Sequence, residues 1–153
     1  MKNKRGQFYL IAAVMLIVVI IGLVSIVNYT SSKDDSKVNL YGDKLKIESE
    51  KVLDYDLNNG ANEIENFTRS YSNYMGSNVN AYFIVGTNSS LRAYTYIAGV
   101  KLDLTNNLEV SDGKIYFTAE DTEYIFDLNK GQNFYFILYQ ETDSGNYVYV
   151  NNY

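Results

Sequence analysis

Carboxylates are the side chains of this chain that could do acid–base or metal chemistry, because histidine and cysteine are both absent. The acidic candidates are four pairs and one single residue: Asp34 and Asp35, Asp54 and Asp56, Glu63 and Glu65, Glu120 and Asp121, and Asp143. Two carboxylates at positions i and i+2 of a helix point in different directions, so these pairs do not form an acid and base couple. Without imidazole or thiol groups, the usual zinc ligands and nucleophile–base pairs are missing. We therefore predict a non-catalytic protein without a metal or cofactor site, with an unrecognised carboxylate site as the least favoured alternative.

The turn that begins at Asp143 is a possible calcium site. The segment Asp143-Ser-Gly-Asn has an acidic residue beside a glycine, but it lacks the alternating acidic loop that calcium needs. The phosphate-binding loop, the dinucleotide fingerprint and the serine elbow are missing as well. These observations again argue against an enzyme.

Three asparagines stand in glycosylation acceptor sequences: Asn28-Tyr-Thr, Asn66-Phe-Thr and Asn88-Ser-Ser. Surface glycans would suit an exported protein that has no disulfides. Asn88 falls in a predicted hairpin turn and should be the most accessible, whereas Asn66 precedes Phe67, which we expect to be buried. Chance occurrence in an asparagine-rich chain is the alternative.

The chain also contains sixteen tyrosines. Tyrosine is an amphipathic residue that is suited to subunit interfaces or adhesion. The alternative, which we favour, is that tyrosine is used as a good strand former with a hydrated tip. Tyrosine content alone therefore does not identify a ligand.

These groups are carried by a chain that begins with an apolar segment. Phe8 to Val27 contains no charged residue and follows Lys2, Lys4 and Arg5. Twenty residues at about 1.5 Å each give about 30 Å of helix, the thickness of the bilayer hydrocarbon core. The basic residues favour a cytoplasmic amino terminus and an exported remainder. A conventional cleaved secretory signal is a weaker alternative, because its apolar core would be shorter.

The boundary of this segment carries a resemblance to a known family. Gly6 ends the basic run and Gln7 directly precedes the apolar helix, which resembles the class III signal peptide of archaeal type IV pilin-like proteins. The resemblance covers about residues 1–28 and implies cleavage between Gly6 and Gln7 by a prepilin peptidase, followed by self-association of the apolar helix through the pilus assembly machinery. The fifth mature position is Ile11 here, where many pilins carry glutamate.

The remaining chain is long enough for one exported domain. We predict a leader at residues 1–6, a membrane or filament-core helix at 7–28, a linker at 29–37 and a domain at 38–153. Three of the 13 basic residues lie in the leader, so ten basic residues meet 18 acidic residues in the remainder, a net charge of −8. Such an acidic domain lacks the basic face that nucleic acid binding requires.

Periodicity predicts an α+β class for this domain. Apolar residues at helical spacing predict amphipathic helices at Val38–Leu57 and Ala61–Met75. The first apolar stripe would contain Leu40, Tyr41, Leu45, Val52 and Tyr55, and the second Ile64, Phe67, Tyr71 and Tyr74 or Met75. Beyond Gly76, β-branched and aromatic residues predict an antiparallel sheet of five to seven strands. The strand candidates are 79–85, 91–97, 100–104, 114–119, 123–128, 133–139 and 147–150.

These predictions favour a type IV pilin-like surface filament subunit or minor pilin. Its apolar helix would contact membrane lipid before processing and identical helices afterwards. The main alternative is a permanently membrane-anchored extracellular binding domain, with a single membrane span and a cytoplasmic amino terminus.

Overall fold

The computed structural model of this chain describes residues 15, 17, 37–59 and 63–151. The chain divides into two units, Met1–Lys37 and Val38–Tyr153, and the second unit contains nearly all of the described residues. The predicted leader and most of the predicted linker lie outside the described residues. Of the predicted apolar helix only Met15 and Ile17 are described, and both are helical. Among the described residues, no helix is both long enough and apolar enough to cross a membrane.

Residues 37–59 form the first helix of the second unit, which confirms the helix predicted at Val38–Leu57. Its inward stripe includes Val38, Leu45 and Ser49, each at most 1% exposed. The prediction that Leu40 and Tyr55 belong to this stripe was wrong, because both side chains are more than half exposed on the opposite face. Leu45 and Val52 do lie on the buried side as predicted, and they share it with the small residues Gly42 and Ser49.

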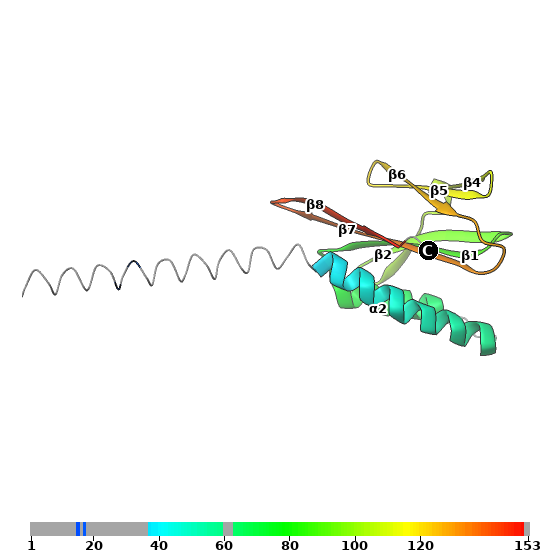
Figure 1. Cartoon of the computed structure of the whole chain (residues 1–153), viewed down its shortest axis with the longest axis horizontal. Coiled ribbons are helices and arrows are strands. Elements are labelled where there is room, and N and C mark those ends of the chain that lie inside the picture. The colour runs from blue at the N-terminus through cyan, green and yellow to red at the C-terminus, as the bar shows by residue number, and fades with distance from the viewer. Residues whose placement is uncertain (1–14, 16, 18–36, 60–62, 152–153) are drawn as a thin grey trace, which may run out of the picture. The chain divides into compact units, whose positions relative to one another are not determined.

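Helix α2 (Ile64–Met75) lies beside the first helix in sequence and in space (Figure 1). Its first backbone N–H groups are capped from the preceding helix, because the Asp56 carboxylate accepts hydrogen bonds from Glu63 N (2.9 Å) and Ile64 N (3.0 Å). The helix ends at Gly76, which adopts a positive φ of 77°. Residues 60–62, which include the predicted start at Ala61, lie outside the described residues.

The buried stripe of α2 consists of Ile64, Thr68, Tyr71 and Met75. The sequence left Tyr74 and Met75 as alternatives for the last position, and the structure places Met75 in the core while Tyr74 is 62% exposed. Phe67, which we expected to be buried, is half-buried. A threonine in the stripe shows that this helix meets the sheet partly through a polar contact.

Eight strands follow α2, and they form two antiparallel sheets. The strands are β1 (Asn80–Thr87), β2 (Ser90–Ile97), β3 (Val100–Asp103), β4 (Leu108–Ser111), β5 (Lys114–Ala119), β6 (Thr122–Asp127), β7 (Asn133–Thr142) and β8 (Gly145–Val150), with a short 3-10 helix, η1 (Thr105–Asn107), after β3. The five-stranded sheet has the order β3-β2-β1-β7-β8, and the three-stranded sheet has the order β4-β5-β6.

The α+β class and the antiparallel pairing are therefore confirmed, whereas the single sheet of five to seven strands needs correction. All seven strand candidates correspond to strands, and β4 was missed. β4 has four residues, two of them Glu109 and Ser111, so it lacks the run of β-branched and aromatic residues on which the prediction relied. It pairs with β5 through the Asp112-Gly113 turn, in which both residues have positive φ.

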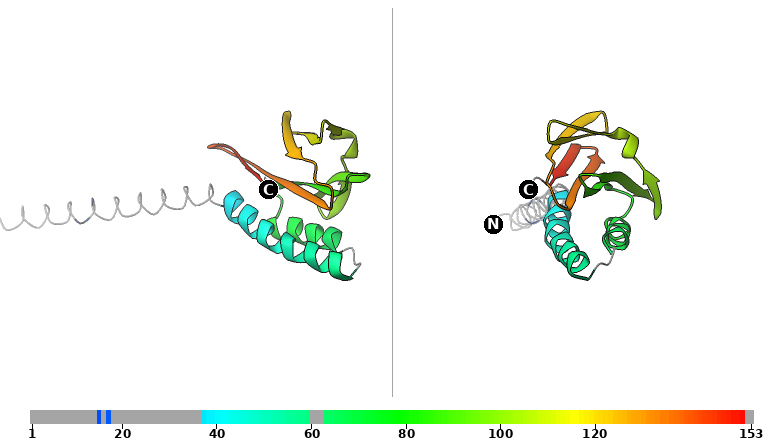
Figure 2. Two further views of the ribbon diagram at one scale, coloured as in Figure 1. Left: turned by 45° about the vertical axis from the view of Figure 1, so that its right-hand side comes forward. Right: turned by 90° about the vertical axis from the view of Figure 1, so that its right-hand side faces the viewer.

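The second unit has three layers, seen from two directions in Figure 2. The 37–59 helix and α2 cover one face of the five-stranded sheet, and their buried residues join Phe83, Phe136 and Leu138 in one apolar cluster. The three-stranded sheet covers the other face, where Ile115 and Phe117 join residues of β1 and β7 in a second cluster. The five-stranded sheet is thus buried on both faces, while its two edge strands, β3 and β8, each pair with one neighbour.

Candidate functional site

The predicted carboxylate candidates are dispersed over the domain. Asp56 caps α2, Glu65 forms an ion pair with Lys101, and Glu120 accepts hydrogen bonds from Tyr82 Oη and from Asn80 Nδ2. Among the described residues, no three acidic side chains lie close enough to hold a metal ion. Asp34 and Asp35 lie outside the described residues.

The turn at Asp143, where we considered calcium, is organised by its neighbours. Thr142 Oγ1 donates to Gly145 O at 2.9 Å and accepts from Ser144 N at 3.2 Å. These bonds join the ends of β7 and β8 within one tight turn. These local hydrogen bonds account for the conformation of the turn.

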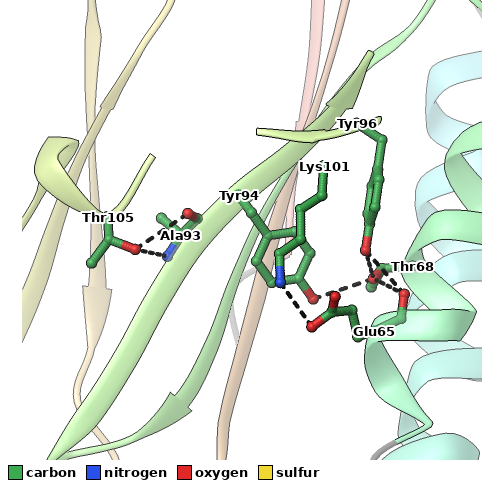
Figure 3. Close-up of polar contacts among 7 residues, drawn as sticks. All are labelled: Glu65, Thr68, Ala93, Tyr94, Tyr96, Lys101 and Thr105. Carbon is green, nitrogen blue, oxygen red and sulfur yellow. Dashed lines mark hydrogen bonds and ion pairs between the residues drawn. The ribbon is translucent and has the colours of Figure 1, made fainter. Parts of the chain in front are cut away.

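A group of polar contacts lies where α2 meets the β2–β3 edge of the sheet (Figure 3). We call this the Glu65 cluster, which consists of Glu65, Thr68, Tyr94, Tyr96 and Lys101. Lys101 Nζ lies 2.7 Å from Glu65 Oε2 and 4.3 Å from the centroid of the Tyr94 ring. Lys101 thus combines an ion pair with a cation–π contact, and it joins β3 to α2.

Hydroxyl groups complete the Glu65 cluster. Thr68 Oγ1 donates to Glu65 O at 3.0 Å and lies 3.2 Å from Tyr94 Oη. Tyr96 Oη donates to the same Glu65 carbonyl at 3.0 Å. Burial raises the pKa of Tyr94 above its usual value, and only the hydrogen bond with Thr68 opposes this shift. The hydrogen bonds of Tyr94 and Tyr96 therefore hold α2 on the sheet.

A cleft of about 240 Å³ opens beside this cluster, between the start of α2 and the β1–β2 hairpin. It is lined by Ile64, Glu65, Val85, Gly86, Thr87, Ser90, Arg92, Tyr94, Lys101 and Gln132. Arg92 is exposed and forms no ion pair within the described part of the chain. A polar ligand could bind to the Arg92 guanidinium group, to the hydroxyls of Thr87 and Ser90 and to the Gln132 amide. The cleft has no base beside a nucleophile.

The charges around this cleft nearly cancel. Asp103 follows on β3, and hydrogen bonds from Thr105, with the nearby charges of Lys101 and Arg92, hold its carboxyl pKa below the usual value. Asp103 and Glu65 are two anions that face the two cations. The cleft therefore does not have the strong positive field that would concentrate an anionic substrate.

The described acceptor asparagines differ in accessibility. Asn88 is exposed in the two-residue turn between β1 and β2. Asn66 is exposed on α2, where its Nδ2 donates to Glu63 Oε2 at 3.1 Å, but the threonine of its acceptor sequence, Thr68, is fully buried. Asn28 lies outside the described residues, as do Gly6 and Gln7 at the predicted processing position.

A second, mostly apolar groove of about 380 Å³ lies between the 37–59 helix and α2. Its lining includes Phe67, Tyr71 and Tyr74, with Lys44 and Glu48 at its margin. The Tyr74 ring makes an edge contact with Tyr41 at 5.8 Å between centroids. Tyr71 and Tyr74 are close in the sequence, but their environments differ. Tyr71 is in the core, whereas Tyr74 is exposed at the rim of the groove.

Nine of the 13 described tyrosines lie in strands. Among the described residues, Tyr55 and Tyr74 are the exposed tyrosines, and the others are buried or half-buried. Sequence reasoning did not single out Arg92 or Lys101. The sequence signal was a period of two along β2, where Arg92, Tyr94 and Tyr96 share one face. Lys101 pairs with Tyr96 from β3, so the cations and the rings lie on the same face.

Comparison with known proteins adds no identification: no family model, curated protein or solved structure matches this chain.

Proposed function

We propose that this chain is a non-catalytic, type IV pilin-like surface filament subunit or minor pilin. A prepilin peptidase would cut between Gly6 and Gln7, and the apolar segment Phe8–Val27 would then leave the bilayer and pack among identical segments. The observation that carries the proposal is the 37–59 helix, which follows the predicted linker and packs along one face of a β-sheet. This order, apolar helix, amphipathic helix and sheet, resembles that of pilin-like proteins.

The outward face of the 37–59 helix supports assembly. Leu40, Ile47 and Tyr55 are 51%, 56% and 55% exposed, and their spacing of seven and eight residues places them on one stripe. Lys44 and Lys51 lie on the same stripe and are exposed as well. This stripe is opposite the buried stripe, so the helix offers neighbours a surface of alternating apolar and cationic side chains.

Processing can be tested by changing the residue before the cut. We expect Gly6→Val to leave the leader on the protein and to abolish filaments in sheared surface material, because a bulky residue would block the peptidase. Asn3→Ala is the matched control within the leader and should be processed normally. Filaments of unchanged abundance from the uncleaved Gly6→Val protein would overturn the proposal.

The helix stripe can be tested separately. Ile47→Glu should leave the unfolding midpoint of the domain unchanged and should greatly reduce filament yield, because it places a carboxylate in the stripe. Ile125→Glu is the control, since Ile125 is similarly exposed (51%) but lies on the outer face of the three-stranded sheet. Equal filament yields from both variants would argue against packing through the helix stripe.

The second candidate is a permanently anchored extracellular binding domain. The cleft beside Arg92 favours it, because this cleft is unused in the first proposal. This candidate predicts a native protein that retains Met1 and is extracted only with the membrane. It also predicts that Arg92→Ala weakens attachment of cells to a surface polymer, whereas the filament proposal predicts no change from this substitution.

A further inference from the structure

The edges of the five-stranded sheet differ in the features that normally prevent strands from pairing with other molecules. Exposed edges are usually protected by prolines, by charged side chains or by bulges. This chain has no proline, and β8, Gly-Asn-Tyr-Val-Tyr-Val, has no charged residue. Val148, in the middle of β8, is 43% exposed. The β8 edge is therefore an open template for a further strand.

The β3 edge is similar on the face away from the helices. Val100 and Leu102 point to that face, because they pair with Ile97 and Thr95, and they are 62% and 41% exposed. The charged residues of β3 point to the helix face, where Lys101 is drawn toward Glu65 on α2. The face away from the helices thus presents aliphatic side chains without a charge at this edge.

The three-stranded sheet shows the protected alternative in the same molecule. Its edge strands carry exposed carboxylates, Glu109 on β4 and both Glu123 and Asp127 on β6. These three residues share the outer face of that sheet, as the pairing of Glu109 with Tyr116 and of Asp127 with Lys114 shows. Both edges of the three-stranded sheet therefore carry charges on the outer face, whereas the five-stranded sheet has an uncharged β8 edge and a β3 edge whose charges, Lys101 and Asp103, lie on the helix face.

We propose that β8 of one copy pairs with β3 of the next copy and joins the five-stranded sheets edge to edge. This inference rests on the proposed filament function. The two edges match by face: Val148 and Val150 of β8 lie on the same side as Val100 and Leu102 of β3, while Tyr147 and Tyr149 lie on the same side as Lys101. A joined sheet would therefore continue an aliphatic face on one side and an aromatic and cationic face on the other.

Strand directions set the geometry of this contact. β3 and β8 both run in the direction of β1, because each is separated from β1 by two antiparallel pairings. Copies that point the same way along a filament would thus pair β8 with β3 in parallel. The interface is heterologous and leaves one free edge at each end, so it propagates instead of closing.

The pairing is small, since β3 has four residues and β8 has six. Four residue pairs alone would not hold two soluble domains together. Subunits that are already assembled through their apolar helices have a high effective concentration, under which a weak contact forms. The edge pairing is therefore a secondary contact that orders the outer domains.

Engineered cysteines test the pairing directly, because the chain has none of its own. Side chains that face each other across neighbouring strands are roughly 5 Å apart, within disulfide range. After oxidation of sheared surface material with copper phenanthroline, Leu102→Cys/Val148→Cys should give a ladder of multimers that dithiothreitol collapses. Val110→Cys/Val148→Cys is the control, because Val110 is similarly exposed (44%) on β4, and it should remain monomeric.

The outcomes separate this pairing from the filament proposal. Filaments that begin at Gln7 but give no ladder would overturn the edge pairing and leave the filament proposal standing. A ladder from protein that retains Met1 would support the edge pairing and overturn the processing. Dimers from either single cysteine variant would show two-fold pairing of like edges and overturn the β8–β3 contact. A second variant, Val148→Asp, should reduce filament order at least several-fold relative to Val110→Asp.

Discussion

The two faces of the five-stranded sheet differ in how many hydroxyl bonds cross them. On the helix face, three tyrosines of the sheet bond to the helices: Tyr94 bonds to Thr68, Tyr96 donates to Glu65 O, and Tyr149 Oη donates to Asp43 Oδ1 at 3.0 Å. On the opposite face, Phe117 and its neighbours form an apolar cluster between the sheets, and two tyrosines, Tyr82 and Tyr135, donate to Glu120 Oε1 and Asp127 O of the β5–β6 hairpin. Apolar contact is non-directional, whereas a hydrogen bond fixes an orientation.

This difference indicates that the helix layer is the one held in a defined position. Under the proposed function, the 37–59 helix connects the domain to the apolar segment that assembles the filament. A helix held by hydroxyl bonds cannot rotate or slide without breaking them. The three-stranded sheet is also bonded, through Tyr82 and Tyr135, but more of its attachment rests on apolar burial.

The largest expected effect comes from the apolar face. Phe117 is 0% exposed, so Phe117→Ala should lower the free energy of unfolding by about 3–5 kcal/mol through lost burial and a cavity. Urea unfolding followed by circular dichroism measures this loss. Thr118→Ala, at the exposed neighbouring position, is the control, and a loss below about 1 kcal/mol for Phe117→Ala would mean that the sheets are not packed through this residue.

Gly42 gives a sharper test of the helix face, because two effects have opposite signs. Alanine is normally the better helix former by about 1 kcal/mol. A Cβ on Gly42, however, would meet the Tyr149 ring at 2.4 Å, so Gly42→Ala should instead destabilise the domain by about 1–3 kcal/mol.

The double variant Gly42→Ala/Tyr149→Ala provides the control for this contact. Removing the ring gives space to the new methyl group, so the added cost of Gly42→Ala should disappear in the Tyr149→Ala background. Thermal unfolding of the four proteins measures the coupling. A stabilising Gly42→Ala would contradict the close approach of the helix to β8.

A smaller loss is expected from the hydroxyl network. Thr68→Val keeps the shape of the side chain but leaves the buried Tyr94 hydroxyl without its partner, at a cost of about 1 kcal/mol. Thr118→Val, at an exposed strand position, should be neutral or slightly stabilising. Equal unfolding midpoints for both variants would show that the bond between Thr68 and Tyr94 does not contribute to stability.

Alkaline pH should reveal the same network. Burial raises the pKa of Tyr71 and Tyr94 above the usual value near 10, and Tyr82, which donates to Glu120, shares this shift. The unfolded tyrosines release protons first, so stability is complete below about pH 10 and falls as the pH rises above that value. Tyr94→Phe should make this fall shallower, whereas Tyr55→Phe at an exposed site should leave its slope unchanged. An identical slope in both variants would contradict the buried hydroxyl.

The sequence predicted much of this fold, because strong local patterns control most of it. The 37–59 helix and the seven recognised strands all have clear periodicity or β-branched and aromatic composition. β4 was missed because pairing with β5, a tertiary effect, makes a strand of a short polar segment. Leu40 and Tyr55 were misplaced because Gly42 and Ser49 occupy part of the buried side, and no local pattern reveals that Gly42 lies against Tyr149.

The site was less predictable than the fold. Glu65 was recognised as a carboxylate candidate, but its partner Lys101 lies on a strand 36 positions later. Such a contact depends on how α2 crosses the β2–β3 edge. Periodicity gives the face of each residue but not the register between a helix and a sheet, so the face that Arg92 and Lys101 share with the tyrosines was predictable and their contact with α2 was not.

The first residue of the native protein tests the filament account most directly. Mass spectrometry of the amino-terminal peptide, taken from sheared surface material of the organism's own cells, should identify Gln7 as the first residue. Cleavage there would remove Lys2, Lys4 and Arg5 and free the apolar segment for assembly. A peptide that begins at Met1 or Lys2 would contradict the account and favour the anchored binding domain.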